Sequence, residues 1–168
     1  MGLAKVKRIS IVGNSGAGKS TLSNKLGRSL GLEVFSIDKI YWLPGWNVRD
    51  EISYKEIHDE LIKSHSWIID GVGYWEAMEH RIAESNIVIF LDVPVALCKE
   101  RAEARIKEEE LYPNSNIAEG CVYGEIIDLQ MKVIDNFHNE LRPKLVNYLS
   151  RLNSEKVKVV GSLEELNI

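Results

Sequence analysis

The segment Gly13-Asn14-Ser15-Gly16-Ala17-Gly18-Lys19-Ser20 carries the strongest chemical signal in the sequence. Its G-x-x-x-x-G-K-[ST] spacing lies between an apolar run and a helical pattern, which is the context of a phosphate-binding loop. Glycines let the backbone wrap a phosphate with inward N–H groups, and the start of a helix adds partial positive charge. We expect Lys19 to reach the β- and γ-phosphates of ATP and Ser20 to bind Mg²⁺. Thr21 completes the predicted nucleotide site.

Two aspartates follow predicted strands. Asp38 comes after the apolar run 33–37, and Asp70-Gly71 comes after 66–69. Ligands of open α/β sheets bind at the carboxyl ends of strands, so Asp38 is a candidate for orienting or deprotonating an acceptor hydroxyl. Asp70 is a candidate for holding Mg²⁺ or contacting the acceptor, with Gly71 beside it. The alternatives are a helix cap for Asp38 and a structural strand-end turn for Asp70.

Arginines form the next group of candidates. Arg101 and Arg105 lie four residues apart on one predicted helix face, so both could reach a transferring phosphate, and Arg81 could bind substrate. The alternative is a solvated face on which neighbouring glutamates pair with these arginines. The sequence alone leaves both possibilities open.

Aromatic side chains crowd the segment after Asp38. Tyr41, Trp42 and Trp46 could stack on a flat substrate or could form a separate hydrophobic cluster. The four histidines have no metal-binding spacing with one another or with either cysteine. We therefore expect no zinc site.

The apolar pattern predicts the elements that position these residues. Short runs without polar alternation indicate parallel strands covered on both faces, at 8–12, 33–37, 66–69, 86–91 and 157–160. Helical patterns separate them at 19–30, 54–64, 75–84, 95–108 and 124–152, and Pro143 should kink the last helix. Asp92, just before the fourth helix, favours a capping role. The prediction is a three-layer α/β P-loop NTPase fold with a five-stranded parallel sheet, in a single domain 1–168 with a mobile loop at 109–121.

Composition restricts the class of protein. The chain has 168 residues, 45% hydrophobic and 27% charged, with a formal net charge of −4. Its longest apolar stretch is too short to span a membrane, and the acidic balance argues against nucleic-acid binding. Two cysteines, Cys98 and Cys121, cannot form a disulfide scaffold, so we expect a reducing, cytoplasmic location. Nothing in the sequence indicates an oligomeric state.

A phosphate-binding loop does not by itself name the reaction. The N-K-x-D element of GTPases is absent from the sequence, and the chain is short for a motor. A small-molecule kinase is the first prediction, with ATP, Mg²⁺ and an unidentified acceptor as its ligands. The alternative is an ATP-hydrolysing switch that acts through a partner, including one linked to DNA topology.

The sequence also resembles the topology modulation proteins, small P-loop relatives of adenylate kinase. Beyond the phosphate-binding loop, the resemblance rests on short segments along the chain: Asp38 to Trp42, Pro44 to Trp46, Trp67 to Gly71, Phe90 to Pro94, Ala118 to Cys121, Asn136-Phe137 and Arg142-Pro143. It implies a nucleoside-kinase-like fold with ATP at the phosphate-binding loop and a lid over the phosphates, at about 106–122. Arg101 and Arg105, just before this segment, are implied to belong to the lid. It also implies that Asp38 and Asp70 face the acceptor and that the segment after Val160 borders adenine.

The chain departs from that pattern at two places. Val72-Gly73-Tyr74-Trp75-Glu76 stands where the family has Asn-Tyr followed by an arginine, and Glu108-Glu109-Glu110 stands where the lid is usually basic. Both departures remove positive charge near the acceptor. They predict a less anionic acceptor or weak transfer.

Overall fold

Five parallel strands form the centre of the structure, a computed structural model that describes residues 6–109 and 117–166. Their order across the sheet is β2-β5-β1-β6-β7. The strands are β1 (Arg8–Gly13), β2 (Val34–Ser36), β5 (Trp67–Asp70), β6 (Ile87–Leu91) and β7 (Val157–Val160). Each coincides with a predicted strand to within about two residues at either end. The predicted three-layer α/β fold with a five-stranded parallel sheet is thereby confirmed.

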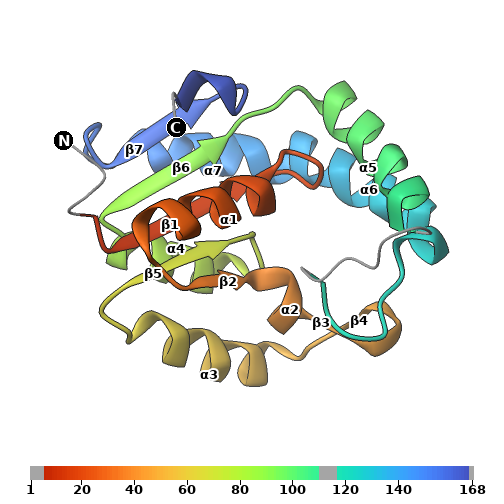
Figure 1. The fold of residues 1–168 in the computed structure, drawn as a ribbon, viewed down its shortest axis with the longest axis horizontal. Helices are drawn as coiled ribbons and strands as arrows, with labels where there is room; N and C mark the ends of the chain where they lie inside the picture. The colour runs from red at the N-terminus through yellow and green to blue at the C-terminus, as the bar shows by residue number, and fades with distance from the viewer. Residues whose placement is uncertain (1–5, 110–116, 167–168) are drawn as a thin grey trace.

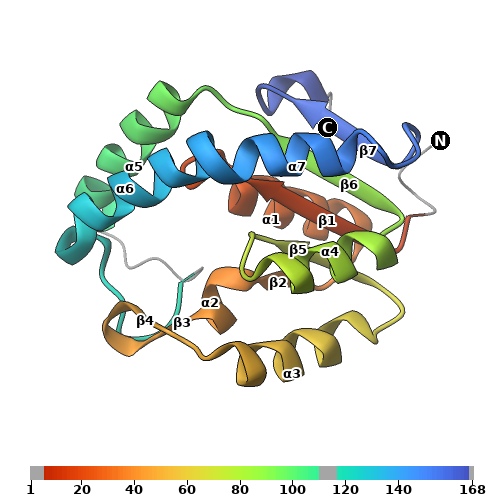
Figure 2. The same ribbon diagram turned by 180° about the vertical axis from the view of Figure 1, so that it is seen from behind.

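Helices cover both faces of the sheet (Figures 1 and 2). On one face, α1 (Lys19–Leu30) and α5 (Val95–Glu109) pack on the side chains of Ile9 and Ile11. On the other, α4 (Trp75–Glu84) and α7 (Arg142–Leu149) pack on Val12 and its neighbours. A third cluster joins α3 (Glu51–Ile62) to the β5 side of the sheet. Strand β1 lies at the centre of the sheet and presents apolar side chains to both layers, so the loop that follows it leaves the middle of the sheet.

The predicted helix 124–152 is a run of four consecutive segments, which Figure 2 shows as one long helical rod along the back of the sheet. A 3₁₀ turn, η3 (Tyr123–Ile126), leads into α6 (Ile127–Asn136), then a π-helical turn (Phe137–Leu141), then α7. Pro143 has no N–H to donate, and just before it the amide of Arg142 bonds to the carbonyl of Phe137, five residues back. The irregularity expected from the proline is therefore a widened turn.

Asp92 does not cap a helix, which corrects the sequence-based interpretation. Helix α5 begins only at Val95, and the Asp92 carboxylate accepts two hydrogen bonds from Arg142, 2.6 Å from Nε and 2.7 Å from Nη2. This bidentate pair ties the carboxyl end of β6 to the start of α7.

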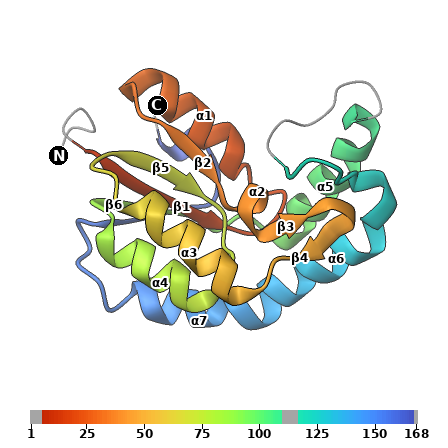
Figure 3. The same ribbon diagram turned by 90° about the horizontal axis from the view of Figure 1, so that it is seen from below.

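A short helix and a small hairpin follow β2, where the sequence pattern indicated only an aromatic loop. Helix α2 (Ile37–Tyr41) leads into β3 (Trp42–Leu43), a 3₁₀ turn (Pro44–Trp46) and β4 (Asn47–Val48). The turn uses positive φ at Gly45 (72°) and Trp46 (59°). Figure 3 shows this hairpin at the same end of the molecule as α6 and the end of α5.

The predicted lid, residues 106–122, is only partly described. Its first residues continue α5 to Glu109, and residues 110–116 lie outside the described part of the chain. The remainder is not a free loop, because Ile117 and Cys121 are buried against Trp42 and Trp46 of the hairpin. The predicted surface loop at 109–121 is therefore wrong in exposure for Ile117 and Cys121, while its mobility stays a prediction.

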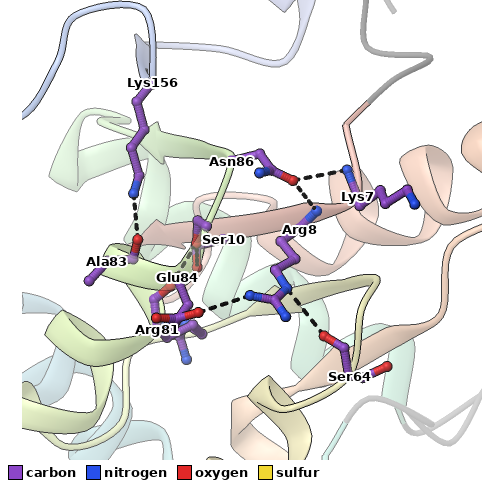
Figure 4. A network of polar contacts seen from close by, with 10 residues as sticks. Lys7, Arg8, Ser10, Ser64, Arg81, Ala83, Glu84, Asn86 and Lys156 are labelled. Carbon is purple, nitrogen blue, oxygen red and sulfur yellow. Dashed lines mark hydrogen bonds and ion pairs between the residues drawn. The ribbon is translucent and has the colours of Figure 1, made fainter.

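A polar network holds the opposite, amino-terminal end of the sheet (Figure 4). The amide of Arg8 donates to Asn86 Oδ1 at 2.9 Å, and its guanidinium pairs with Glu84 at 2.9 Å. Lys156 donates to the carbonyl of Ala83 at 2.8 Å. These contacts hold together the amino-terminal ends of the strands. The polar residues predicted to form a site lie at the other, carboxyl-terminal end of the sheet.

Within the described residues, none of the helices has the length and apolar character needed to cross a membrane.

Candidate active site

The loop between β1 and α1 is shaped for a phosphate. Gly16 and Gly18 have φ values of +77° and +94°, a region that favours glycine. A Cβ atom on Gly16 would lie 2.2 Å from the carbonyl oxygen of Cys98, so α5 packs directly on the loop. Gly18 is the N-cap of α1 and supplies no side-chain hydrogen bond, which leaves the first amides of the helix for an anion. This donor set fits the phosphates of a nucleotide.

Lys19 points back over this loop. Its Nζ donates to the carbonyl of Asn14 at 2.8 Å. Burial lowers the pKa of Lys19, while the negative charges of Asp38 and Asp70 act in the opposite direction. The ammonium group therefore lies within the electrostatic reach of both predicted carboxylates.

Asn14 organises the loop from within. Its Oδ1 accepts the amide of Ser15 at 2.8 Å, and its Nδ2 donates to the carbonyl of Ile134 on α6 at 2.9 Å. A second contact between the loop and α6 runs from Gln130 Nε2 to Ser15 Oγ, at 3.4 Å. Helix α6 is thus attached to the phosphate-binding loop at two points.

Asp38 lies in the first turn of α2, and the N-cap of that helix is Ser36. The capping interpretation of Asp38 is therefore wrong. Asp38 lines the same cavity as Lys19, and it lies just beyond the carboxyl-terminal end of β2. A carboxylate and the ammonium-bearing Lys19 therefore line one cavity.

Asp70 ends β5 behind this cavity. It is 2% exposed and accepts hydrogen bonds from the hydroxyls of Ser23 and Ser36. Burial raises the pKa of Asp70, and the bond from Ser23 opposes that shift. The Ser23 hydroxyl also lies 3.1 Å from the carbonyl of Ser20, so it joins the two residues predicted to bind Mg²⁺. Their hydroxyl and carboxylate oxygens are the donor type that Mg²⁺ prefers.

Arg81 lies outside the cavity lining. It is fully buried under the loop that follows β5, and its Nη2 donates to the carbonyl of Gly71 at 2.6 Å. Nε and Nη1 have no hydrogen-bond partner within the described residues. Gly71 itself has φ +112°, and a Cβ there would lie 2.6 Å from the Cβ of Ile37. The structure thus brings Arg81 and Gly71 together as a pair that shapes one side of the site.

The arginines of α5 lie on the phosphate side of the site. Arg101 Nη1 is 3.5 Å from the carbonyl of Gly16, a long contact. The charge of Arg105 lowers the pKa of Lys19, which places that guanidinium within electrostatic reach of the ammonium. On the outer side of the loop, the side chain of Leu163 would lie 3.4 Å from a Cβ on Gly18. The segment predicted to border adenine therefore adjoins the phosphate-binding loop.

One cavity of about 490 Å³ connects these elements. It brings together several of the residues singled out in the sequence: Gly13, Asn14, Ser15, Lys19, Asp38, Tyr41, Trp42 and Trp46. The other predicted residues, including Ser20, Thr21, Asp70, Gly71, Arg81, Arg101 and Arg105, lie outside its lining.

Sequence reasoning missed the opposite wall of the cavity. Helix α6, the turns on either side of it and α7 supply that wall: Ile126, Leu129, Gln130, Val133, Asn136, Phe137, Glu140, Leu141 and Lys144. Their spacing of three and four residues is typical of one face of a helix, and it is visible within the predicted helix 124–152.

Comparisons with known proteins agree with the fold. No family model matches the chain. An uncharacterized protein of Bacillus subtilis (strain 168), YqaC, is 30% identical over 121 residues, which cover 70% of this chain and 65% of YqaC. A shikimate kinase of Actinobacillus succinogenes is 24% identical over 176 residues, which cover 81% of this chain and 99% of that enzyme.

A solved structure has the same fold. The shikimate kinase of Bacteroides thetaiotaomicron superposes with a TM-score of 0.51 at 18% identity, over 79% of this chain and 80% of its own. The chain therefore has the fold of P-loop kinases of this kind. These comparisons do not name the topology modulation proteins, although a kinase-like relation fits the resemblance noted in the sequence.

Proposed function

We propose that this protein is an ATP-dependent small-molecule kinase. The observation that carries the proposal is that one cavity joins Lys19 of the phosphate-binding loop to the carboxylate of Asp38. Phosphoryl transfer depends mainly on positioning and on neutralising charge, and it needs a phosphate cradle beside a group that holds the acceptor hydroxyl. The likeness to proteins named shikimate kinase supports the same class of reaction.

Bound Mg·ATP would supply the phosphoryl group. Lys19 and the loop amides would neutralise its negative charge, and Arg101 and Arg105 would add positive charge from α5. Asp38 would accept the hydrogen bond of the acceptor hydroxyl and take its proton as the oxygen bonds to phosphorus and ADP leaves. Ser20, with Asp70 behind it, would hold the metal ion.

The remaining residues would shape the acceptor side. Tyr41 and Trp42 line the cavity and would contact the acceptor, while Arg81 would act through Gly71 by fixing the loop after β5. Residues 106–122 would serve as the lid of a single kinase domain. A nucleotide-dependent switch, the alternative that the sequence leaves open, needs no acceptor cavity beside its phosphate-binding loop. The cavity therefore favours transfer.

The test is ADP release from Mg·ATP by the purified protein, with and without pooled nucleosides, nucleotides and hydroxylated metabolites. Lys19→Ala serves as the blank, and Lys55→Ala, an exposed lysine on α3, is the matched control. We expect one pool to stimulate ADP release and to yield a phosphorylated product by mass spectrometry, in wild type and Lys55→Ala only. A slow release that no pool changes, with no product, would reject the kinase and favour the switch.

A further inference from the structure

The cavity has apolar side chains on both walls, away from the phosphate-binding loop. Leu129 and Val133 of α6 remain 42% and 38% exposed although they line it. Opposite them stand Tyr41, Trp42 and Trp46, whose rings pack edge to face, with centroids 4.9 Å and 5.4 Å apart. Two apolar walls of this kind suit a flat ring, whose burial would remove exposed hydrocarbon from water.

The polar side chains of the cavity are rich in hydrogen-bond acceptors. Asp38 and Glu140 are carboxylates. Gln130 is 4% exposed, and its Oε1 has no hydrogen-bond partner within residues 6–109 and 117–166. A buried acceptor without a partner costs free energy, so this oxygen favours a ligand that brings a donor such as a hydroxyl group.

Positive charge is scarce at the same place. The described lining contains no arginine, and its two cations are both engaged. Lys19 donates to Asn14, and the ammonium group of Lys144 lies 3.8 Å from the centroid of the Trp75 ring. A ligand carboxylate in this cavity would meet Asp38 and Glu140 without a guanidinium to pair with, and an unpaired buried charge is costly.

We propose that the acceptor is an uncharged ring compound that presents hydroxyl groups to Asp38 and Gln130, and not a hydroxy acid or a phosphate ester. The inference rests on the proposed phosphoryl transfer and names the acceptor class of that same site. This class excludes shikimate, the substrate in the names of two relatives, because shikimate is a carboxylic acid.

The experiment measures binding, so it does not depend on turnover. The full chain is saturated with Mg·AMP-PNP to fill the nucleotide site, and matched pairs are titrated by calorimetry: uridine with orotidine, and methyl shikimate with shikimate. Within each pair the ring and hydroxyls are shared. The carboxylate of orotidine is replaced by hydrogen in uridine, and that of shikimate by a methyl ester in methyl shikimate. We expect the uncharged members to bind, at least about tenfold tighter than their carboxylate partners. Equal or tighter binding of the carboxylates, or no binding by either uncharged compound, would overturn the inference.

Two variants test the residues behind this preference. Gln130→Leu should weaken the uncharged ligands by about tenfold, because it removes the buried acceptor oxygen. Glu140→Gln should strengthen the carboxylates relative to their uncharged partners, because it removes a negative charge from the cavity lining, whereas Glu56→Gln, an exposed control on α3, should leave that ratio unchanged. Circular dichroism and thermal melting of the same samples report that each variant is folded. Unchanged ligand affinities in both Gln130→Leu and Glu140→Gln would show that these residues do not determine the preference for uncharged ligands.

Failure of this inference is distinguishable from failure of the proposed function. Phosphorylation of a carboxylate acceptor by ATP would leave the kinase in place and reject the uncharged class. Loss of ADP formation with every acceptor, in a protein that still binds the uncharged ligands, would reject the kinase and leave the binding preference standing.

Discussion

The amide of Gly45 donates a hydrogen bond to the carbonyl of Gly120 at 3.0 Å, and this contact joins the aromatic hairpin to the segment 117–122. Trp46 Nε1 adds a bond to the carbonyl of Val122 at 3.0 Å. Two segments that are far apart in the sequence therefore form one unit beside the cavity. The aromatic wall keeps its position because this unit holds it.

Gly120→Ala should loosen this unit. Gly120 has φ +77°, and a Cβ there would lie 3.1 Å from Pro44 Cβ, so alanine would bring strain of about 1–2 kcal/mol. We expect the Gly45 amide to exchange with solvent roughly tenfold faster, measured by hydrogen–deuterium exchange. Gly31→Ala is the control, because φ there is +66° and the space is open. Equal exchange in both variants would contradict the role of this contact.

Asp38→Asn should lower transfer without weakening nucleotide binding. The amide keeps the size of the side chain but cannot take a proton, so we expect kcat to fall by about 10²-fold or more with ATP affinity unchanged. Single-turnover kinetics and AMP-PNP titration measure the two quantities. Asp128→Asn, exposed on α6, should behave as wild type. Undiminished transfer in Asp38→Asn would remove this residue from the reaction.

Arg81→Met should weaken acceptor binding more than it destabilises the folded protein. The change leaves the Gly71 carbonyl without its 2.6 Å bond but also removes a buried charge with two nitrogens that lack partners, so the two effects on stability oppose each other. We expect unfolding free energy to change by about 1 kcal/mol or less and the KM of the acceptor to rise about tenfold. Arg151→Met, near the C-terminal end of the chain, is the matched control. A normal acceptor KM would show that Arg81 does not position the loop.

His58 should make stability depend on pH. Burial, and after it the charge of Arg81, lower the pKa of His58 from its usual 6.5 to about 4, although the Asp59 carboxylate partly opposes this. The folded protein keeps the ring neutral while the unfolded chain protonates it. Stability is therefore complete above pH 6.5 and is lost as the pH falls towards 4, by at most about 1.4 kcal/mol per pH unit.

Urea denaturation at about pH 7 and about pH 5 tests this dependence. His58→Phe keeps a ring stacked on Tyr54 and removes the titration, so it should lose less stability between the two values than wild type. His65→Asn changes an exposed histidine and should follow wild type. Parallel behaviour of His58→Phe and wild type would contradict the assignment.

Sequence patterns predicted the sheet and the phosphate-binding loop because both have strong local signals. An uninterrupted apolar run such as Ile87–Leu91 marks a buried strand, and the glycine spacing marks the loop. Helix α2 and the hairpin were missed because five-residue and two-residue elements show no periodicity. Arg81 was assigned to a surface or a substrate clamp, since only the packing of α4 under the sheet buries it. Gln130 was missed because its burial depends on where α6 lies over the loop.

The carboxamide of Asn14 links the phosphate-binding loop to one wall of the cavity, so it should couple the binding of nucleotide and acceptor. A phosphate on the Ser15 amide must displace Asn14 Oδ1, and the same side chain holds Ile134 on the helix that forms one cavity wall. Nucleotide and acceptor should therefore bind with a coupling free energy, each changing the dissociation constant of the other by the same factor. In double-reciprocal plots of initial rate against one substrate at several fixed concentrations of the other, independent sites give lines that meet on the horizontal axis. Coupled binding would move the intersection above or below that axis.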